Sequence, residues 1–130
     1  MDVLCDSSFL INLVSKPTTC QDKVEYEVGP LRFIVPSNVI AELEAIKKRV
    51  GPKRSKMAET AITIANSNFE VRSIGDLYSN VDDLLIEYAI KNRCAVATLD
   101  HDLLRRLIAN DVLVITLTTN RMIVANHYQP

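Results

Sequence analysis

The chain has 130 residues, 48% of them hydrophobic, and a formal net charge of −1 at pH 7. This length predicts one domain with a packed core over residues 1–130, in which the tail from about 119 adds an edge strand or wraps around the domain. No apolar run approaches the roughly 20 residues that cross a bilayer, no cysteine pair suggests a zinc site, and no net positive charge favours nucleic acid. We therefore expect a soluble, cytoplasmic protein that does not bind a membrane.

Strands and helices alternate along the chain. In chain order we expect a strand at 2–5, helices at 7–14 and 20–29, a strand at 31–35, helices at 37–50 and 57–65, a strand at 69–73, a helix at 81–92, a strand at 95–99, a helix at 101–110 and a strand at 112–117. This alternation, with several strands apolar on both faces, predicts an α/β fold. Its central parallel five-stranded sheet is flanked by helices on both faces.

Single residues predict where several helices start, end and pack. A serine is placed to cap the first helix, Pro17 ends it, and Gly51 with Pro52 ends the third. Helical spacing predicts that the helix at 81–92 buries Leu85, Ile86, Ala89 and Ile90.

Acidic residues occur where a parallel sheet places its functional groups. Asp6 follows the first strand and Asp100 follows the fourth, and the carboxyl ends of parallel strands form the crevice of an α/β protein. Glu42 lies about one turn into the helix after the second strand. Asp82 and Asp83 begin the helix before the fourth strand. If the strands are neighbours, these carboxylates converge on one crevice.

Such a carboxylate cluster needs a positive partner, because unit charges about 4 Å apart repel by several kcal/mol at intermediate dielectric. Mg²⁺ or Mn²⁺ would neutralise the cluster, and the sequence has no group of histidines or cysteines for a softer metal. Simpler functions stay open for some members. Asp82 or Asp83 can cap a helix, and Asp102 can interact with a helix dipole. The coincidence of the whole set predicts a metal site.

The acidic motifs, in their order, resemble those of the PIN-domain nucleases. The matching segments are the strand ending in Asp6 with Ser7 beside it, VIAEL around Glu42, VDDLLIEYAI around Asp83, and VATLDHDL around Thr98 and Asp100. The resemblance covers residues 1 to about 118 and is greatest to the small PIN proteins linked to ribosomal-RNA processing in archaea and eukaryotes. The chain departs from that branch at Ser8, where asparagine is usual.

The resemblance implies a single PIN-like nuclease domain that hydrolyses phosphodiester bonds of RNA with the help of one or two Mg²⁺ or Mn²⁺ ions. The implied substrate is single-stranded or locally unpaired RNA, in particular ribosomal RNA, and the product carries a 5′ phosphate. The implied catalytic and metal-binding residues are Asp6, Glu42, Asp83 and Asp100, with Asp82 and Asp102 as further metal ligands. Ser7 and Thr98 would orient ligands or the attacking water through hydrogen bonds.

Two groups of basic residues are candidates for contact with RNA. They lie around the helix break at 47–56 and on the helix after Asp100, and their members are Lys47, Lys48, Arg49, Lys53, Arg54, Lys56, Arg105 and Arg106. Such groups neutralise phosphates and make binding depend on salt, although a lysine and arginine run is also a common solubilising surface. With 5% aromatic residues, stacking on RNA bases is expected to contribute little, although Tyr78 could stack on a base. We assign no catalytic role to His101 or His127.

Other functions stay open at this point. A ribonuclease toxin with an antitoxin partner has the same chemistry, and a non-catalytic RNA-binding ribosome assembly factor can use the same scaffold. The partner is then RNA together with a second copy of the chain, an assembly factor or an antitoxin. A receiver-type signalling domain is disfavoured because no lysine follows the fifth strand, and a haloacid-dehalogenase-type phosphatase would need D-x-D where the chain reads DSS.

Overall fold

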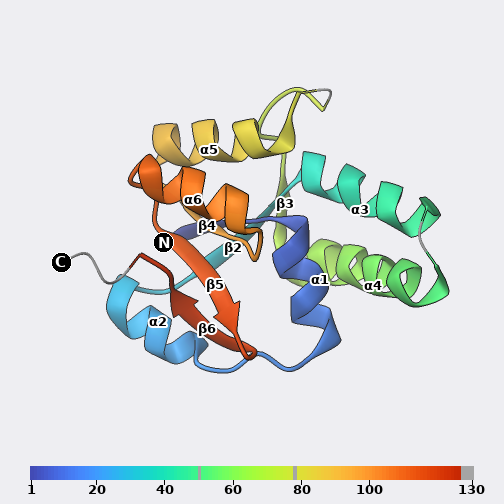
Figure 1. Cartoon of the computed structure of the whole chain (residues 1–130), viewed down its shortest axis with the longest axis horizontal. Coiled ribbons are helices and arrows are strands. Elements are labelled where there is room, and N and C mark those ends of the chain that lie inside the picture. The colour runs from blue at the N-terminus through green and yellow to red at the C-terminus, as the bar shows by residue number, and fades with distance from the viewer. Residues whose placement is uncertain (50, 78, 127–130) are drawn as a thin grey trace.

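The computed structural model describes residues 1–49, 51–77 and 79–126, so Tyr78 and His127 lie outside the described part of the chain. Its elements are β1 (Asp2–Cys5), α1 (Ser7–Ser15), α2 (Gln21–Val28), β2 (Arg32–Pro36), α3 (Ser37–Arg49), α4 (Pro52–Asn68), β3 (Glu70–Arg72), α5 (Val81–Asn92), β4 (Ala95–Ala97), α6 (His101–Ala109), β5 (Val114–Thr118) and β6 (Arg121–Val124). The strands form a sheet with helices around it (Figure 1). The expected alternation is present, although α4 begins earlier than expected, with Pro52 in its first turn.

The sheet has six strands in the order β3-β2-β1-β4-β5-β6. β1 pairs in parallel with β2 and β4, and β2–β3 and β4–β5 are also parallel pairs. The expectation of five strands is corrected by β6, which pairs antiparallel with β5. The turn between them has left-handed φ angles at Thr119 (51°) and Asn120 (62°), as a tight two-residue hairpin requires. The tail therefore adds an edge strand.

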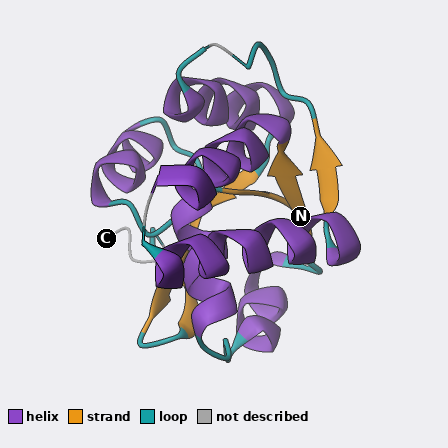
Figure 2. Cartoon of the chain, turned by 90° about the vertical axis from the view of Figure 1, so that its right-hand side faces the viewer, coloured by secondary structure: helices purple, strands orange, loops and turns teal. Residues whose placement is uncertain are grey.

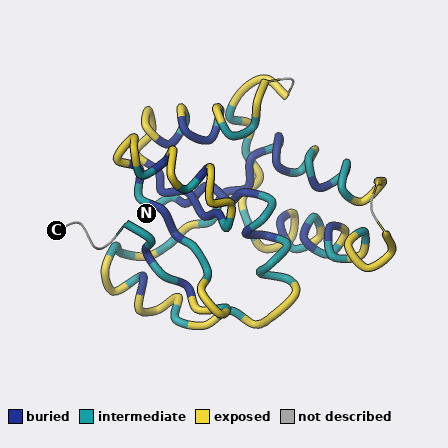
Figure 3. The backbone as a smooth tube through the Cα atoms, viewed as in Figure 1, coloured by how far each residue is buried: buried dark blue, intermediate teal, exposed yellow. Residues whose placement is uncertain are grey.

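Different helices cover the two faces of the sheet (Figure 2). Because alternate side chains of a strand point to opposite faces, Val3 and Cys5 of β1 pack into one core cluster and Leu4 packs into the other. Residues of α1, α2, α3 and α4 complete the first cluster, and residues of α5 and α6 complete the second. Figure 3 shows the buried strands at the centre of these layers.

The structure corrects several details of the helices. No side chain caps α1, and its cap position is held by Asp6 rather than by a serine. The cap of α5 is Asn80, whose side chain accepts the backbone N–H of Asp83 at 3.0 Å, so neither Asp82 nor Asp83 caps this helix. Ile90 was expected in the buried stripe of α5 but is 51% exposed, because it lies at the edge of that stripe in the last turn.

Helices α3 and α4 form a hairpin that projects from the rest of the molecule (Figure 1). The Ser55 hydroxyl donates to the carbonyl oxygen of Lys47 at 2.8 Å and ties the two helices together near the turn. The turn end of the hairpin is exposed (Figure 3). Among the described residues, no helix is both long enough and apolar enough to cross a membrane.

Candidate functional site

The carboxyl ends of β1 and β4 lie side by side because these strands are neighbours in the sheet. The backbone N–H of Asp6 donates to the carbonyl oxygen of Ala97 at 2.9 Å, so the pairing continues one residue beyond β1. Asp100 lies just past β4, at the N-cap position of α6. Strand order therefore brings the two strand-end aspartates to one edge of the sheet.

The side chain of Asp6 is buried and held in place. Only 5% of the residue is exposed, and its Oδ2 accepts hydrogen bonds from the hydroxyls of Ser8 at 2.9 Å and Thr98 at 2.8 Å. Thr98 is fully buried just past β4, so its hydrogen bond to Asp6 links the end of β4 to the end of β1. A buried carboxylate with two donors has a fixed orientation, which a ligand of a metal ion needs.

Glu42 reaches the same edge of the sheet from α3, which begins directly after β2. The hydroxyl of Ser7, the first residue of α1, donates to Glu42 Oε1. This bond joins the start of α1, next to Asp6, to the middle of α3. Ser7 and Thr98 thus contact the carboxylates that they were expected to orient.

Asp100 has a structural function besides any chemical one. Its Oδ1 accepts the backbone N–H groups of Asp102 at 2.9 Å and Leu103 at 3.0 Å, which caps the N-terminus of α6. Its own N–H donates to the Thr98 hydroxyl at 3.0 Å. The cap and the Thr98 contact together fix where the second carboxylate oxygen of Asp100 lies.

In three of the carboxylates, one oxygen accepts a hydrogen bond (the held oxygen) and the other accepts none from a described residue (the open oxygen). Asp6 Oδ2, Glu42 Oε1 and Asp100 Oδ1 are the held oxygens, and their second oxygens accept no hydrogen bond from a described residue. Mg²⁺ and Mn²⁺ prefer such oxygen ligands, so the donor set fits a hard divalent cation. In the described part of the chain no three acidic, histidine or cysteine side chains already form a metal site, and the fit therefore rests on donor chemistry.

The structure separates Asp82 from Asp83. Partial burial of the Asp82 carboxyl raises its pKa, and the negative charges of Asp6, Asp100 and Glu42 raise it further. Asp82 therefore lies within electrostatic range of the other three acidic residues. Its position three, four and seven residues before the buried Leu85, Ile86 and Ala89 is the helical spacing that could have indicated this from sequence.

Asp83 points elsewhere, toward solvent and α6. Its side chain is 56% exposed, and its Oδ1 accepts a hydrogen bond from Nη2 of Arg106 at 2.6 Å. The sequence analysis placed Asp83 among the catalytic residues and Asp82 only among the further metal ligands. The geometry favours the reverse order, because Asp83 is exposed and paired with Arg106, whereas the charges of the other acidic residues act on the partly buried Asp82.

Asp102 is not brought into the crevice. Its side chain is 85% exposed and forms an ion pair with Arg105, one turn further along α6. The sequence analysis left two functions open for Asp102, interaction with a helix dipole and metal binding. The first fits better, because Asp102 lies in the first turn of α6.

The larger basic group lies at the turn of the α3–α4 hairpin. All six of its members are exposed, namely Lys47, Lys48, Arg49, Lys53, Arg54 and Lys56. Arg49 follows Glu42 by two turns of α3, which separates them by about 10 Å along the helix axis and leaves them on one side of it.

Ser8 is a contributor that the sequence analysis did not assign to the site. Its hydroxyl donates to Asp6, lies 3.3 Å from the Thr98 hydroxyl, and accepts the N–H of Leu99 at 3.0 Å. It thus links the chain just after β1 to the chain just after β4. The available signal was its position two residues after Asp6, where the related branch usually has asparagine, a side chain that can also donate and accept.

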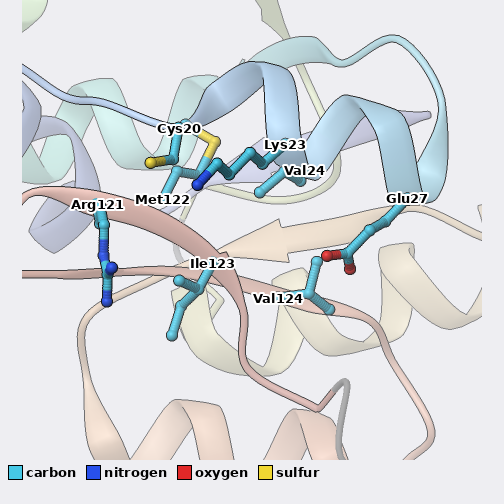
Figure 4. A pocket seen from close by; sticks show the side chains of 8 residues that line it. All are labelled: Cys20, Lys23, Val24, Glu27, Arg121, Met122, Ile123 and Val124. Carbon is cyan, nitrogen blue, oxygen red and sulfur yellow. The ribbon is translucent and has the colours of Figure 1, made fainter.

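A groove of about 380 Å³ lies away from these carboxylates, between α2 and β6 (Figure 4). Val24 of α2 and Met122, Ile123 and Val124 of β6 make its walls largely apolar. None of the sequence-predicted site residues lines this groove, so the carboxylate crevice and the groove are separate features.

Comparison with known protein families gives the identity of the fold. The family model for a PIN like domain matches residues 3–120, which is most of the chain. The chain belongs to the PIN-like domain family. A search of curated protein sequences gives no significant match.

Solved structures of similar fold agree with this family. The PIN-like domain matches the structure of the PIN domain endonuclease Utp24 with a TM-score of 0.76 and 18% identity, covering 95% of this chain and 90% of the other. A domain of a functionally unknown protein from Methanocaldococcus jannaschii matches with a TM-score of 0.57 and 18% identity over 91% of each chain. A chain of VapBC2 from Rickettsia felis, bound to a promoter DNA fragment, matches with a TM-score of 0.61 and 17% identity over 89% of this chain and 98% of the other. The fold is therefore that of PIN-domain nucleases.

Proposed function

We propose that this PIN-like domain is a metal-dependent endoribonuclease. The observation that carries the proposal is a set of hydrogen bonds at the ends of β1 and β4 that holds one oxygen of each of three carboxylates and leaves the other open, those of Asp6, Glu42 and Asp100. The charges of these three residues also raise the pKa of Asp82. Carboxylates that are oriented by their neighbours and left with a free oxygen suit a divalent cation and a phosphodiester.

The proposed metal ligands are Asp6, Glu42, Asp82 and Asp100. These residues would hold Mg²⁺ or Mn²⁺, which would supply an activated water and charge stabilisation for phosphodiester hydrolysis. Ser7 holds Glu42, while Ser8 and Thr98 hold Asp6, so that these carboxylates keep their orientation when a substrate approaches. Asp82 takes the place in this set that the sequence analysis assigned to Asp83.

The proposed substrate is single-stranded or locally unpaired RNA, and ribosomal RNA is the first candidate. The resemblance of the acidic motifs to the ribosomal-RNA-processing branch supports this choice, and the likeness to the PIN domain endonuclease Utp24 supports internal cleavage. The likeness to VapBC2 keeps a toxin as a second candidate with the same chemistry. A small antitoxin reading frame beside the gene would favour the toxin, and ribosome or translation genes would favour processing.

The experiment that tests the proposed function uses a ribosomal-RNA fragment with unpaired segments. The purified chain is incubated with this RNA in Mn²⁺, in Mg²⁺ and in EDTA, and the product ends are mapped. We expect internal cuts with 5′ phosphates in either metal and none in EDTA. Tight RNA binding without cleavage in any metal would contradict the endonuclease and favour a non-catalytic assembly factor.

Neutralising the hairpin is expected to weaken RNA binding. In the triple variant Lys53→Gln, Arg54→Gln and Lys56→Gln, the slope of log Kd against log salt should fall by about 2, since each contact with single-stranded nucleic acid contributes about 0.7. A charge-matched triple variant at Lys16, Lys23 and Lys91 is the control, because these exposed lysines lie outside the α3–α4 hairpin. Equal slopes in the two variants would assign the hairpin charges to solubility alone.

Removing the Ser8 hydroxyl is expected to reduce cleavage without unfolding the protein. Ser8→Ala leaves Asp6 with one side-chain donor, and loss of such orienting contacts typically costs about 10- to 100-fold in activity or metal affinity. Ser15→Ala is the matched control, because Ser15 is exposed on the same helix and donates only to the Asn12 carbonyl oxygen. Cleavage rates and thermal unfolding are measured for both; a rate of Ser8→Ala equal to wild type would remove Ser8 from the site.

A further inference from the structure

One ion pair stands at the rim of the carboxylate crevice. Nη2 of Arg106, on α6, lies 2.6 Å from Oδ1 of Asp83, on α5, and the two side chains are 50% and 56% exposed. The charge of Arg106 also acts on the neighbouring Asp82, where it lowers the pKa that the other carboxylates raise. Arg106 is thus a cation beside an anionic site, and it is held there by a carboxylate that does not face the site.

The contact with Asp83 uses little of what Arg106 can offer. A guanidinium carries five N–H donors, and in the described part of the chain this one donates a single side-chain hydrogen bond. Two parallel donors of an arginine match two oxygens of a phosphate, which makes arginine well suited to phosphate recognition. Donors therefore remain for a second anion on the crevice side.

The ion pair between Asp83 and Arg106 is also weak enough for another anion to replace Asp83. Ion pairs between exposed side chains contribute little to stability, because water and salt screen the charges and both side chains lose freedom. A phosphodiester held between the crevice and α6 would compete directly with Asp83 for the guanidinium. Its two free oxygens can take two donors, where Asp83 takes one.

We propose that Arg106 binds a phosphate of the RNA at the rim of the crevice, and that Asp83 occupies its guanidinium until RNA arrives. Asp83 is then a stand-in for the phosphate and a competitor of the substrate, not a metal ligand. The inference rests on the proposed nuclease function, which supplies RNA as the substrate. It deepens that function by naming the contact that controls entry of the phosphate.

The ion pair Arg105–Asp102 provides an internal comparison. It lies on the same helix and has the same charges, but Asp102 and Arg105 are 85% and 71% exposed and belong to one element. Arg106 is one of the main charges that act on Asp82, whereas Arg105 pairs with Asp102 on its own helix. Replacement of Arg105 therefore removes the same charge from the same helix at a position that is paired within α6 instead of with α5.

The test is RNA binding without metal, so that it does not depend on cleavage. A fluorescein-labelled oligouridine of about 12 nucleotides, within the usual site size for single strands, is titrated in EDTA at several salt concentrations. The proteins are wild type, Arg106→Gln, Arg105→Gln, Asp83→Asn and the double variant Asp83→Asn with Arg106→Gln. Asn keeps the shape of Asp83 and removes only its charge.

We expect Arg106→Gln to weaken binding about three- to tenfold at low salt and to lower the salt slope by about 0.7, the contribution of one contact. Arg105→Gln should have a smaller effect. Asp83→Asn should tighten binding about two- to threefold, as the loss of a weak exposed competitor predicts. This gain should vanish in the Arg106→Gln background, because its target is then absent.

Three outcomes would overturn the inference. They are equal effects of Arg106→Gln and Arg105→Gln, a gain from Asp83→Asn that persists without Arg106, and no gain from Asp83→Asn. A parallel cleavage assay in Mn²⁺ separates this failure from that of the proposed function. Normal metal-dependent cleavage with any of these three binding results would leave the nuclease intact and remove only the exchange between Asp83 and phosphate. If wild type neither binds nor cleaves RNA, both are overturned.

Discussion

Asp100→Asn is expected to abolish metal-dependent RNA cleavage while leaving the fold unchanged. Asparagine is as good an N-cap as aspartate, so its Oδ1 can still accept the N–H groups of Asp102 and Leu103 at the start of α6. The substitution removes only the negative charge and the anionic oxygen offered to a cation. Because residues that merely orient ligands cost about 10- to 100-fold, loss of a ligand should cost at least about 100-fold.

The measurement for this variant is the initial rate of cleavage in Mn²⁺, together with the thermal unfolding midpoint. The matched control is Asp102→Asn, which removes the same charge from the same turn of α6 at an exposed side chain paired with Arg105. Its rate should stay within about twofold of wild type, since surface substitutions usually have small effects. Wild-type cleavage by Asp100→Asn would exclude this residue from the site, and equal losses in both variants would point to a general effect of charge on α6.

The same substitution at two adjacent aspartates, Asp82 and Asp83, is expected to have very different effects on cleavage. Asp82→Asn should abolish cleavage, because Asp82 shares the crevice with Asp6, Glu42 and Asp100. Asp83→Asn should keep a near-normal kcat, because Asp83 is exposed and bound to Arg106. The measurement is kcat and KM of both variants on one RNA in Mn²⁺. The reverse pattern would restore Asp83 as the metal ligand, as the sequence motif alone suggested.

Asp82→Asn should also change stability in a pH-dependent way when EDTA removes metal. The folded state raises the Asp82 pKa, so folding favours the protonated form and the ionised form destabilises the native state. This cost is absent below the usual carboxyl pKa of about 4 and grows as pH rises through the raised pKa of the folded state. Asp82→Asn should therefore raise the unfolding midpoint at pH 7 and leave it unchanged at pH 3. An unfolding midpoint of Asp82→Asn below that of wild type at pH 7 would contradict repulsion between Asp82 and the other carboxylates.

Local sequence patterns predicted much of the fold and part of the site. The alternation of apolar strands with helices predicted the parallel sheet and its two layers of helices, because periods of 2 and 3.6 residues are set by backbone geometry. The same reasoning placed Asp6 and Asp100 at strand ends. Parallel strands all end at the same edge, so the position of each carboxylate along its own strand was sufficient once β1 and β4 became neighbours.

Other features depended on contacts between distant parts of the chain. The Thr98 hydroxyl and the Asp6 carboxylate are 92 residues apart, and the Ser7 contact with Glu42 spans 35 residues. Ser8 joins the same network through Leu99. The residue types in these contacts are common in any loop or helix start. Their function follows from where the sheet order and the packing of α3 place them.

By itself, the sequence determined that this protein is an α/β domain with acidic residues around the carboxyl edge of its sheet, and its ordered motifs indicated a PIN-domain nuclease. Only the tertiary structure placed Asp82 under the charges of the other acidic residues, paired Asp83 with Arg106, and added the tail as a sixth strand. The physical reason is the same in each case. A local pattern sets the type of an element, but the rotation of a helix about its axis and the partner of an edge strand are set by the surfaces against which they pack.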